Sequence, residues 1–324
     1  MVDQDELSRP VSTFADAAEV TAVGHRIVHG GEHYRPTVID DTLFAKLTDL
    51  VELAPLHNAP AVAAIAEARQ RWPDVDHVAV FDTAFHHTLP AVASTFLLPE
   101  RFRERGIRRY GFHGLSVAWA SAQVDFARVV VCHLGGGCSV TAVLDGTSVD
   151  TSMGFTPLDG VPMASRAGAV DPGVLIYLLR HGVKLDDLEH ALEHESGLVG
   201  LAGTGDVSQI VLDTAPQSSL ALEIYCYRVA QAVAAMATAL AGIDALVFTA
   251  GVGEHSERVR AVVCAQLAFL GVALDADANA GASGDADITA PGSPVAVRIV
   301  TAREDVMIAR GVRSVLAGDS LHPL

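Results

Sequence analysis

The sequence predicts an α/β protein with two lobes, and three observations support this prediction. Short β-rich apolar runs alternate with helical patterns along the chain, as in folds that cover a sheet with helices. Half of the 324 positions are hydrophobic, so the chain can bury a large core, and its length favours two domains over one. Most of the apolar runs end at Gly, Asp or Thr, and no internal repeat or long linker interrupts them.

The apolar runs predict six strands, and two helices stand out between them. The strands are residues 20–28, 77–81, 129–134, 140–144, 245–249 and 295–301. The stronger helix covers residues 220–240, with Ser218 or Ser219 as its cap and Gly242 as its stop. Its apolar stripe is Leu222, Tyr225, Val229, Val233, Met236 and Leu240. The second helix, residues 256–270, follows a glycine-rich turn, and the Ala/Asp/Gly stretch 276–293 is expected to be a surface loop.

Charge and cysteine usage exclude several classes of protein. A net charge of −17 disfavours binding to nucleic acid or to anionic membranes, which requires a basic face. The acidic, polar start lacks the pattern of a signal peptide, and no apolar run has the length of a membrane span. Four cysteines without a CxxC pair suggest reduced thiols, so we expect a cytoplasmic protein.

Two glycine turns follow predicted strands and are candidates for holding phosphate groups. They are "HLGGGCS" after the strand at 129–134 and "TAGVGEHS" after the strand at 245–249. Glycine turns at strand ends let backbone N–H groups approach an anion closely. The chain has only two lysines, Lys46 and Lys184, and neither follows a glycine loop, so a P-loop of the GxxxxGK[ST] type is absent. Each turn taken alone fits a tight β-turn better than a ligand loop, and it is their shared position after apolar strands that favours a ligand loop.

Isolated polar residues form the second signal. Arg26 lies inside the β-run of "GHRIVHGG" and Arg166 lies in the small-residue loop "PMASRAGAVDPG". Each arginine fits either a common anion or an ordinary salt bridge, and the residues alone leave both alternatives open. Asp82 and two histidines follow a buried strand in "FDTAFHHTLP". We expect the histidines to be structural, because we find no HxxxH or HExxH spacing that would put two of them on one helical face.

Ten motifs, taken in order, resemble the acetate kinase family over about residues 24–310. They are "HRIVHGG", "APLHNAP", "FDTAFHHTLP", "RRYGFHGLS", "HLGGGCSVTAVLDG", "DTSMGFTPLDG", "SRAGAVDPG", "SGLVGLAGTGD", "VFTAGVGEHSERVR" and "EDVMIAR". The resemblance implies the two-lobed actin-like (ribonuclease-H-like) ATPase fold, a homodimer, and reversible transfer of the γ-phosphoryl group of ATP to acetate. It also implies Mg²⁺ as cofactor, with Mn²⁺ as a substitute, and ADP and acetyl phosphate as products.

The resemblance assigns a role to each matching residue. Arg26 and Arg166 would flank the carboxylate and the transferring phosphoryl group, His113 would donate to the phosphoryl oxygens, and Asp82 would orient an arginine or the acetate. The acetate methyl group would contact Val28, Leu56, Phe112 and Pro157, with His57 also lining the cleft. ATP would contact His133, Gly135, Gly137, Asp206, Gly251, Gly253 and Glu254, and Glu304 would help to hold the metal ion. The implied lobes are residues 1–83 with 306–324, and residues 84–305.

The sequence also departs from the family pattern. The opening strand and Asn/Gly/Ser-rich turn of the family have no counterpart, so the first lobe is expected to be truncated at its N-terminus. Gly136, Ala169, Ser208 and Arg303 stand where the family usually has other polar residues. Three hypotheses therefore stay open: an acetate kinase, a kinase of another short carboxylate such as propionate, and a non-catalytic homologue that acts as a binding or dimer partner.

Overall fold

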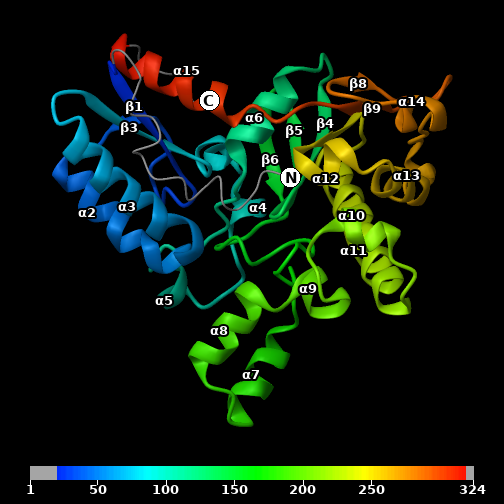
Figure 1. The fold of residues 1–324 in the computed structure, drawn as a ribbon, viewed down its shortest axis with the longest axis horizontal. Helices are drawn as coiled ribbons and strands as arrows, with labels where there is room; N and C mark the ends of the chain where they lie inside the picture. Colours follow the sequence, from blue (N-terminus) through cyan, green and yellow to red (C-terminus); the bar gives the residue numbers. More distant parts are fainter. Residues whose placement is uncertain (1–19, 319–324) are drawn as a thin grey trace. The chain divides into compact units, whose positions relative to one another are not determined.

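The computed structural model describes residues 20–318, which fall into two compact units (Figure 1). Unit 1 contains the described residues up to Thr88, residues 110–119 and the chain from Arg303 onwards; unit 2 contains residues 89–109 and 120–302. The sequence placed the boundaries at 83 and 306 and did not separate residues 110–119. Their membership of unit 1 has a local cause: Gly114 N donates to Asp82 O at 2.9 Å, and a Cβ at Gly114 would lie 2.2 Å from that oxygen.

Unit 1 is built on a three-stranded sheet with the order β1-β3-β2, in which β1 and β3 are parallel. Its strands are β1 (Ala22–Ile27), β2 (Thr37–Val38) and β3 (Asp76–Phe81). Its helices are α2 (Asp41–Asp49), α3 (Pro55–Arg71) and α15 (Glu304–Leu316), with 3-10 turns at Leu50–Leu53 and Ala84–Thr88. Helix α6 (Gly114–Ala122) begins in unit 1.

The two faces of this sheet pack against different helices. Ile27, Ala79 and Phe81 share one cluster with side chains of α2 and α3. The other face meets α15, and β1 must have a small residue there because a Cβ at Gly24 would lie 2.6 Å from Ile308 and 2.8 Å from Val312. Side chains alternate along a strand, so Arg26 lies on the same face as Gly24.

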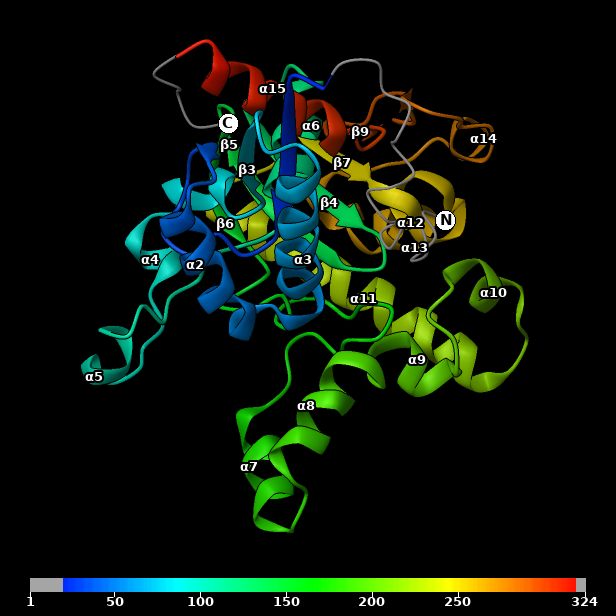
Figure 2. The ribbon, with the colours of Figure 1, turned by 60° about the vertical axis from the view of Figure 1, so that its left-hand side comes forward.

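Unit 2 contains a six-stranded sheet with the order β6-β5-β4-β7-β9-β8, whose central strands β4, β7 and β9 are parallel. The strands are β4 (Arg128–Leu134), β5 (Cys138–Leu144), β6 (Thr147–Thr151), β7 (Ala245–Thr249), β8 (Ala286–Asp287) and β9 (Ala296–Ile299). The helices are α4 (Ala91–Ser94), α5 (Glu100–Arg103), α7 (Pro172–Arg180), α8 (Leu185–His194), α9 (Gly197–Ala202), α10 (Val207–Leu212), α11 (Pro216–Ala239), α12 (Ala250–His255), α13 (Glu257–Gln266) and α14 (Ala276–Ala280). Figure 2 shows α7 and α8 extending away from this sheet. All four cysteines lie in this unit and are buried free thiols.

The long helix α11 packs against β4, β5 and β6. Its buried residues include Tyr225, Val229, Val233 and Met236, so the apolar stripe read from the sequence is confirmed. The predicted cap was wrong: the helix begins at Pro216, a residue whose fixed φ suits the first helical position, and Ser218 Oγ instead donates to Asp213. This is the one helix among residues 20–318 with the length and composition of a membrane span, and 44% of its apolar window is buried within the protein.

Two further predictions need correction. The glycine stretch after β7 is not an open turn, since Ala250–His255 forms the short helix α12 directly at the strand end. The stretch 276–293 is not a featureless surface loop, because it contains α14 and β8 and buries Asn279. Low-complexity composition predicted solvent exposure, but this segment pairs with β9, buries Ile288 and is also held by the side-chain hydrogen bonds of Asn279.

Candidate active site

Arg26 lies at the centre of an ion-pair cluster in unit 1. Its Nη2 lies 2.7 Å from Asp82 Oδ2, its Nε donates to Asp82 Oδ1 at 3.1 Å, and its Nη1 lies 2.9 Å from Glu304 Oε2. The fold explains this meeting: Asp82 directly follows β3, and Glu304 precedes Ile308 by one turn on the α15 face that covers β1. We call these three residues the unit 1 ion-pair cluster.

The cluster holds two carboxylates against one guanidinium. Burial alone would lower the pKa of Arg26, but the charges of Asp82 and Glu304 raise it above its ordinary value. The sequence left open whether each arginine serves an anion or a salt bridge, and Arg26 forms salt bridges on two sides. Both Asp82 carboxylate oxygens face the guanidinium, which fixes the orientation of Arg26.

Glu304 has one carboxylate oxygen that Arg26 does not occupy. Oε1 is buried and has no hydrogen-bond partner within the described chain. No group of three or more His, Cys, Asp or Glu side chains suitable for a metal occurs among residues 20–318. Mg²⁺ is commonly held by one or two carboxylates together with substrate phosphates and water, so a single free carboxylate oxygen fits that ion.

The remaining candidate residues of unit 1 lie on neighbouring segments. His113 has a positive φ of 58° and immediately precedes Gly114, which packs on the Asp82 carbonyl. Phe112 is fully buried, and its carbonyl lies 2.9 Å from His86 Nε2. Val28, after β1, and Leu56 and His57, in the first turn of α3, are each half-buried.

The two histidines of "FDTAFHHTLP" make contacts within unit 1. His86 is fully buried, and burial lowers its pKa to about 4. His87 Nδ1 lies 2.9 Å from Ala84 O, and its ring stacks on Tyr34. Both residues thus connect the segment after β3 to the rest of the unit.

In unit 2 the two glycine turns lie at adjacent strand ends. Strands β4 and β7 are parallel neighbours, with His133 paired to Thr249 at their carboxyl ends. Gly135 and Gly137 form the β4–β5 hairpin turn, and a Cβ at Gly135 would lie 3.5 Å from the Cβ of Ala250. Ligands of open α/β sheets bind beyond the carboxyl ends of parallel strands, so this edge is the expected place for a nucleotide.

Arg166 is buried near this edge with few partners. Its exposed fraction is 6%, and residues 20–318 provide one hydrogen bond, from Nη1 to Pro157 O at 2.8 Å, and no ion pair. Burial lowers the pKa of Arg166, and the nearby Cys138 and Glu193 oppose that shift. A guanidinium has five N–H donors, so most of its donors are available to an anion.

Backbone contacts join the Arg166 loop to the glycine turns. Ala164 N donates to Gly136 O, and Val199 N donates to Ala164 O. Gly197, with a φ of 63°, lies so close to this loop that a Cβ would be 2.3 Å from Met163 O. Asp206 caps α10, and its pKa is lowered mainly by the hydrogen bond from Ser208. The segment 197–206, the Arg166 loop and the β4–β5 turn thus form one connected surface of unit 2.

Helix α12 contributes three of the candidate nucleotide contacts. A Cβ at Gly251 would meet nothing within 4 Å, whereas one at Gly253 would make ordinary contact with Phe248. The Glu254 carboxylate accepts a hydrogen bond from Ala302 N at 2.9 Å. Thr249, directly before the helix, is buried, and its hydroxyl has no hydrogen-bond partner among residues 20–318.

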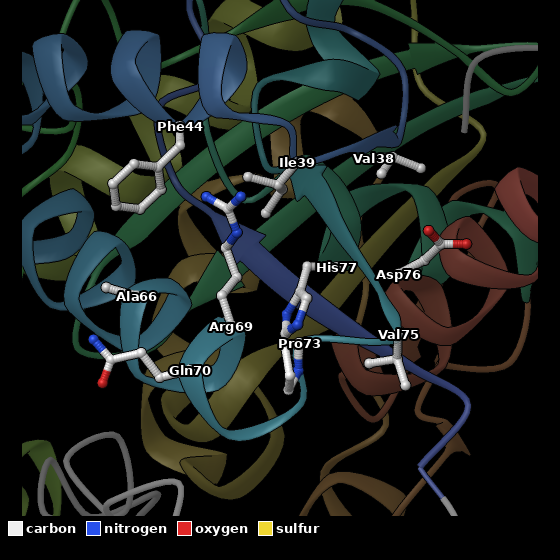
Figure 3. Close-up of a pocket in the computed structure, with 10 residues that line it drawn as sticks. All are labelled: Val38, Ile39, Phe44, Ala66, Arg69, Gln70, Pro73, Val75, Asp76 and His77. Carbon is white, nitrogen blue, oxygen red and sulfur yellow. The ribbon is translucent and has the colours of Figure 1, made fainter.

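One pocket of unit 1 lies away from every candidate residue. It has a volume of about 530 Å³ and is lined by β2, α2, α3 and the start of β3 (Figure 3). His77 lines it and interacts with His25, whose Nε2 lies 3.0 Å from His77 Nδ1. Because none of the residues assigned from the sequence lines this pocket, we do not place the chemistry there.

One prediction about the histidines was wrong, because an HxxxH spacing does occur. His190 and His194 are four residues apart on α8, and their ring centroids are 4.7 Å apart. Both rings lie on a projecting helix, and no third metal-binding side chain joins them in the described chain. The pair therefore does not alter the assignment of the site.

The two sheets and their covering helices define an α/β protein of the two-lobed actin-like ATPase fold, and the arginines and strand-end glycine turns suit a phosphotransferase. The model of the acetokinase family matches residues 5–310. The chain belongs to the acetokinase family, and it is a phosphotransferase with a carboxyl group as acceptor.

Comparisons with individual proteins agree with this assignment. An acetate kinase from Synechococcus sp. (strain JA-2-3B'a(2-13)) is 43% identical over 95% of this chain and 80% of its own length. An acetate kinase from Gloeobacter violaceus is 47% identical over 91% of this chain and 77% of its own length. The chain therefore spans about four fifths of the length of these relatives.

Two solved structures are similar to the chain. The crystal structure of Porphyromonas gingivalis acetate kinase has a TM-score of 0.85 and 35% identity, covering 93% of this chain and 80% of that one. A propionate kinase from Francisella tularensis subsp. tularensis SCHU S4 has a TM-score of 0.87 and 36% identity, covering 93% and 81%. The actin-like fold expected from the motifs is thereby confirmed.

Proposed function

We propose that this protein transfers the γ-phosphoryl group of ATP to acetate, giving acetyl phosphate and ADP, and that it catalyses the reverse reaction. A carboxylate oxygen of acetate attacks the γ-phosphorus, and the bond from that phosphorus to the leaving oxygen of ADP breaks. Acetate is ionised at neutral pH, so the attack requires no general base. The protein must instead position two anions and neutralise their repulsion.

The observation that carries this proposal is the state of Arg166. A buried guanidinium with one carbonyl partner and no ion pair in the described chain is costly, and an anionic ligand would remove that cost. Phosphoryl oxygens match the planar fork of a guanidinium. We assign Arg166 to the transferring phosphoryl group, with the adjacent Pro157 near the acetate methyl group.

The unit 1 ion-pair cluster has a different role in the proposed reaction. Arg26 is held by Asp82 and Glu304, so its orientation is fixed before any substrate binds. We assign Arg26 to the acetate carboxylate, Asp82 to the orientation of Arg26, and His113 to donation toward the phosphoryl oxygens. Val28, Leu56 and Phe112 supply apolar surface for the acetate methyl group, beside His57.

ATP and a divalent ion complete the proposal. Glu304 would hold Mg²⁺, or Mn²⁺ in its place, through Oε1, and the ion would neutralise phosphate charge during transfer. The nucleotide would lie along the carboxyl ends of β4 and β7. Its contacts there are His133, Gly135, Gly137, Asp206, Gly251, Gly253 and Glu254.

Propionate is the alternative acceptor, because one of the similar structures is a propionate kinase. One methylene in an apolar pocket changes selectivity by about 1–3 kcal/mol, so the two acids should differ by roughly 10–200-fold. The experiment is to trap the acyl phosphate with hydroxylamine from ATP, Mg²⁺ and either acid. A higher kcat/KM for acetate supports the proposal, and a higher value for propionate replaces it. No acyl hydroxamate from either acid would favour a non-catalytic binding homologue.

We further propose that the protein is a cytoplasmic homodimer. Helix α7 buries none of its residues, and Val174, Ile176, Tyr177 and Leu179 are exposed along it. Helix α11 exposes Leu220, Ile224 and Tyr227 within the same unit. A second copy is the partner that would cover such surfaces, and light scattering should give twice the mass of the chain. The variant Tyr177→Lys should shift the mass toward that of a monomer.

A further inference from the structure

Arg260 on α13 is a buried cation that the motifs did not single out. Its exposed fraction is 1%, the lowest of any arginine among the described residues. Nε donates to Asn279 Oδ1 at 2.7 Å, and Nη2 donates to Asn279 O at 3.1 Å. Its remaining hydrogen bonds run from Nη1 to Gly253 O at 2.9 Å and to Glu254 O at 2.7 Å. All four bonds go to amide oxygens, and the described residues give it no ion pair.

The two carbonyls that Arg260 reaches belong to the end of α12. The last carbonyls of a helix lack partners within the helix, and a cation near them is favourable. Asn279 fixes Arg260 from the opposite side, since Asn279 Nδ2 also donates to Glu257 O at 3.0 Å. The side chains of Arg260 and Asn279 therefore tie α12, α13 and α14 together behind the candidate nucleotide contacts.

Glu254 extends this connection to the segment before α15. Its backbone carbonyl accepts from Arg260, while its carboxylate accepts from Ala302 N. Ala302 stands two positions before Glu304, the residue assigned to the metal ion. Moving the Glu254 backbone would therefore shift both a nucleotide contact and an anchor of the chain leading to Glu304.

We propose that Arg260 and Asn279 are positioning residues for phosphoryl transfer: they hold Gly253 and Glu254 in the arrangement that receives the nucleotide. This inference rests on the proposed function. A purely structural role explains the geometry less well, because apolar residues of similar volume stabilise a core at least as well as a buried charge does. Burial lowers the pKa of Arg260, and the charge of Glu257, which forms no ion pair with it among the described residues, opposes that shift.

The test compares Arg260→Lys and Asn279→Ala with Arg128→Gln in the full chain. Arg128 is the matched control, because it anchors the opposite end of β7 through Asp244, with Nε 3.1 Å from Oδ1. We would measure kcat, KM for ATP, KM for acetate, the affinity for Mg-ADP by calorimetry, and urea unfolding. Both test variants should raise KM for ATP and weaken Mg-ADP binding at least tenfold, with KM for acetate within twofold. The control should lose stability without either change.

Two results would overturn the inference. One is unchanged Mg-ADP affinity in both test variants; the other is an equal loss of affinity in Arg128→Gln, which would tie the effect to stability alone. If Arg260→Lys does not fold, the milder Asn279→Ala decides by the same criteria. Mg-ADP binding by the unaltered chain without turnover of either acid would contradict the proposed function alone. The Mg-ADP affinities of the variants would then still test the role of Arg260. Absence of both binding and turnover would overturn both proposals.

Discussion

Replacing Arg166 by methionine should lower the activity of the protein while its stability stays the same or rises. Methionine fills a similar volume without charge, so the variant removes the guanidinium from its buried position. If Arg166 neutralises the transferring phosphoryl group, kcat should fall by about 10³-fold, which corresponds to ~4 kcal/mol of transition-state stabilisation. This is the loss expected when a desolvated positive charge leaves a reaction between two anions.

The effect on stability follows from the contacts of Arg166. The variant loses one hydrogen bond, to Pro157 O, whose net worth is about 1 kcal/mol. It also relieves the desolvation of a charge without an ion pair, a cost of several kcal/mol in buried positions. The free energy of unfolding should therefore stay equal or rise. An increase of 1 kcal/mol would raise Tm by about 2 °C in a chain of this size.

The assay pairs hydroxamate-trapped acetyl phosphate formation with urea and thermal unfolding of the same samples. Glu193→Gln is the control, because Glu193 is the acidic residue whose charge acts on Arg166. That control should keep most of the activity. Parallel losses of activity and stability in Arg166→Met, or activity within tenfold of the unaltered chain, would refute the reasoning. Arg166 would then be a structural cation.

Three further predictions test other parts of the site. Asp82→Asn removes the negative charge beside Arg26 while keeping the shape of the side chain. The value of kcat should fall about 10²-fold, and the affinity for Mg-ADP should stay within threefold. Equal losses of kcat and of Mg-ADP affinity, measured by calorimetry, would make Asp82 a structural residue. Gly251→Ala adds a Cβ where no protein atom lies within 4 Å, so Tm should stay the same or rise. The same methyl group should raise KM for ATP about tenfold if the nucleotide lies there. An unchanged KM for ATP would mean that Gly251 does not contact the nucleotide. His86 has a pKa of about 4 in the folded protein against 6.5 when unfolded, so its contribution to stability is present above pH 6.5 and is lost as the pH falls toward 4. At pH 5 this loss is ~2 kcal/mol, and His86→Gln should flatten the pH dependence of urea unfolding by that amount; an unchanged pH dependence would contradict the effect of burial.

The sequence predicted the main strands of both sheets because apolar β-runs carry a strong local signal. The strand ending at Thr249 has the predicted bounds, and the other five lie within two residues of theirs. Strands β2, β6 and β8 were missed. The two residues of β2 and of β8 carry no periodic pattern, and β6 reads TSVDT, with one apolar residue. The strand character of all three comes from pairing with neighbouring strands, which is a tertiary effect.

The candidate site was predictable to a different extent in each unit. Motifs pointed to Arg26, Asp82 and Glu304, yet nothing local says that one guanidinium meets both carboxylates, since that depends on α15 packing across β1. Arg260 and Asn279 were missed for a related reason. Charged and amide side chains are mostly exposed, and the low-complexity surroundings of Asn279 predicted a surface loop. A signal existed in the placement of Arg260 four residues after the helix cap Ser256, on the side of α13 that carries Val263 and Cys264.

The packing of α15 on Gly24 also sets the order in which this protein can fold. Strand β1 and helix α15 cover each other, so unit 1 cannot bury both faces of its sheet until α15 has been synthesised. Strands β4 to β9 of unit 2 are complete earlier in synthesis. Contacts between residues so distant in sequence form slowly, so refolding should show unit 2 protected from hydrogen exchange before β1. A chain that ends before Glu304 should keep a folded unit 2 beside an unfolded β1.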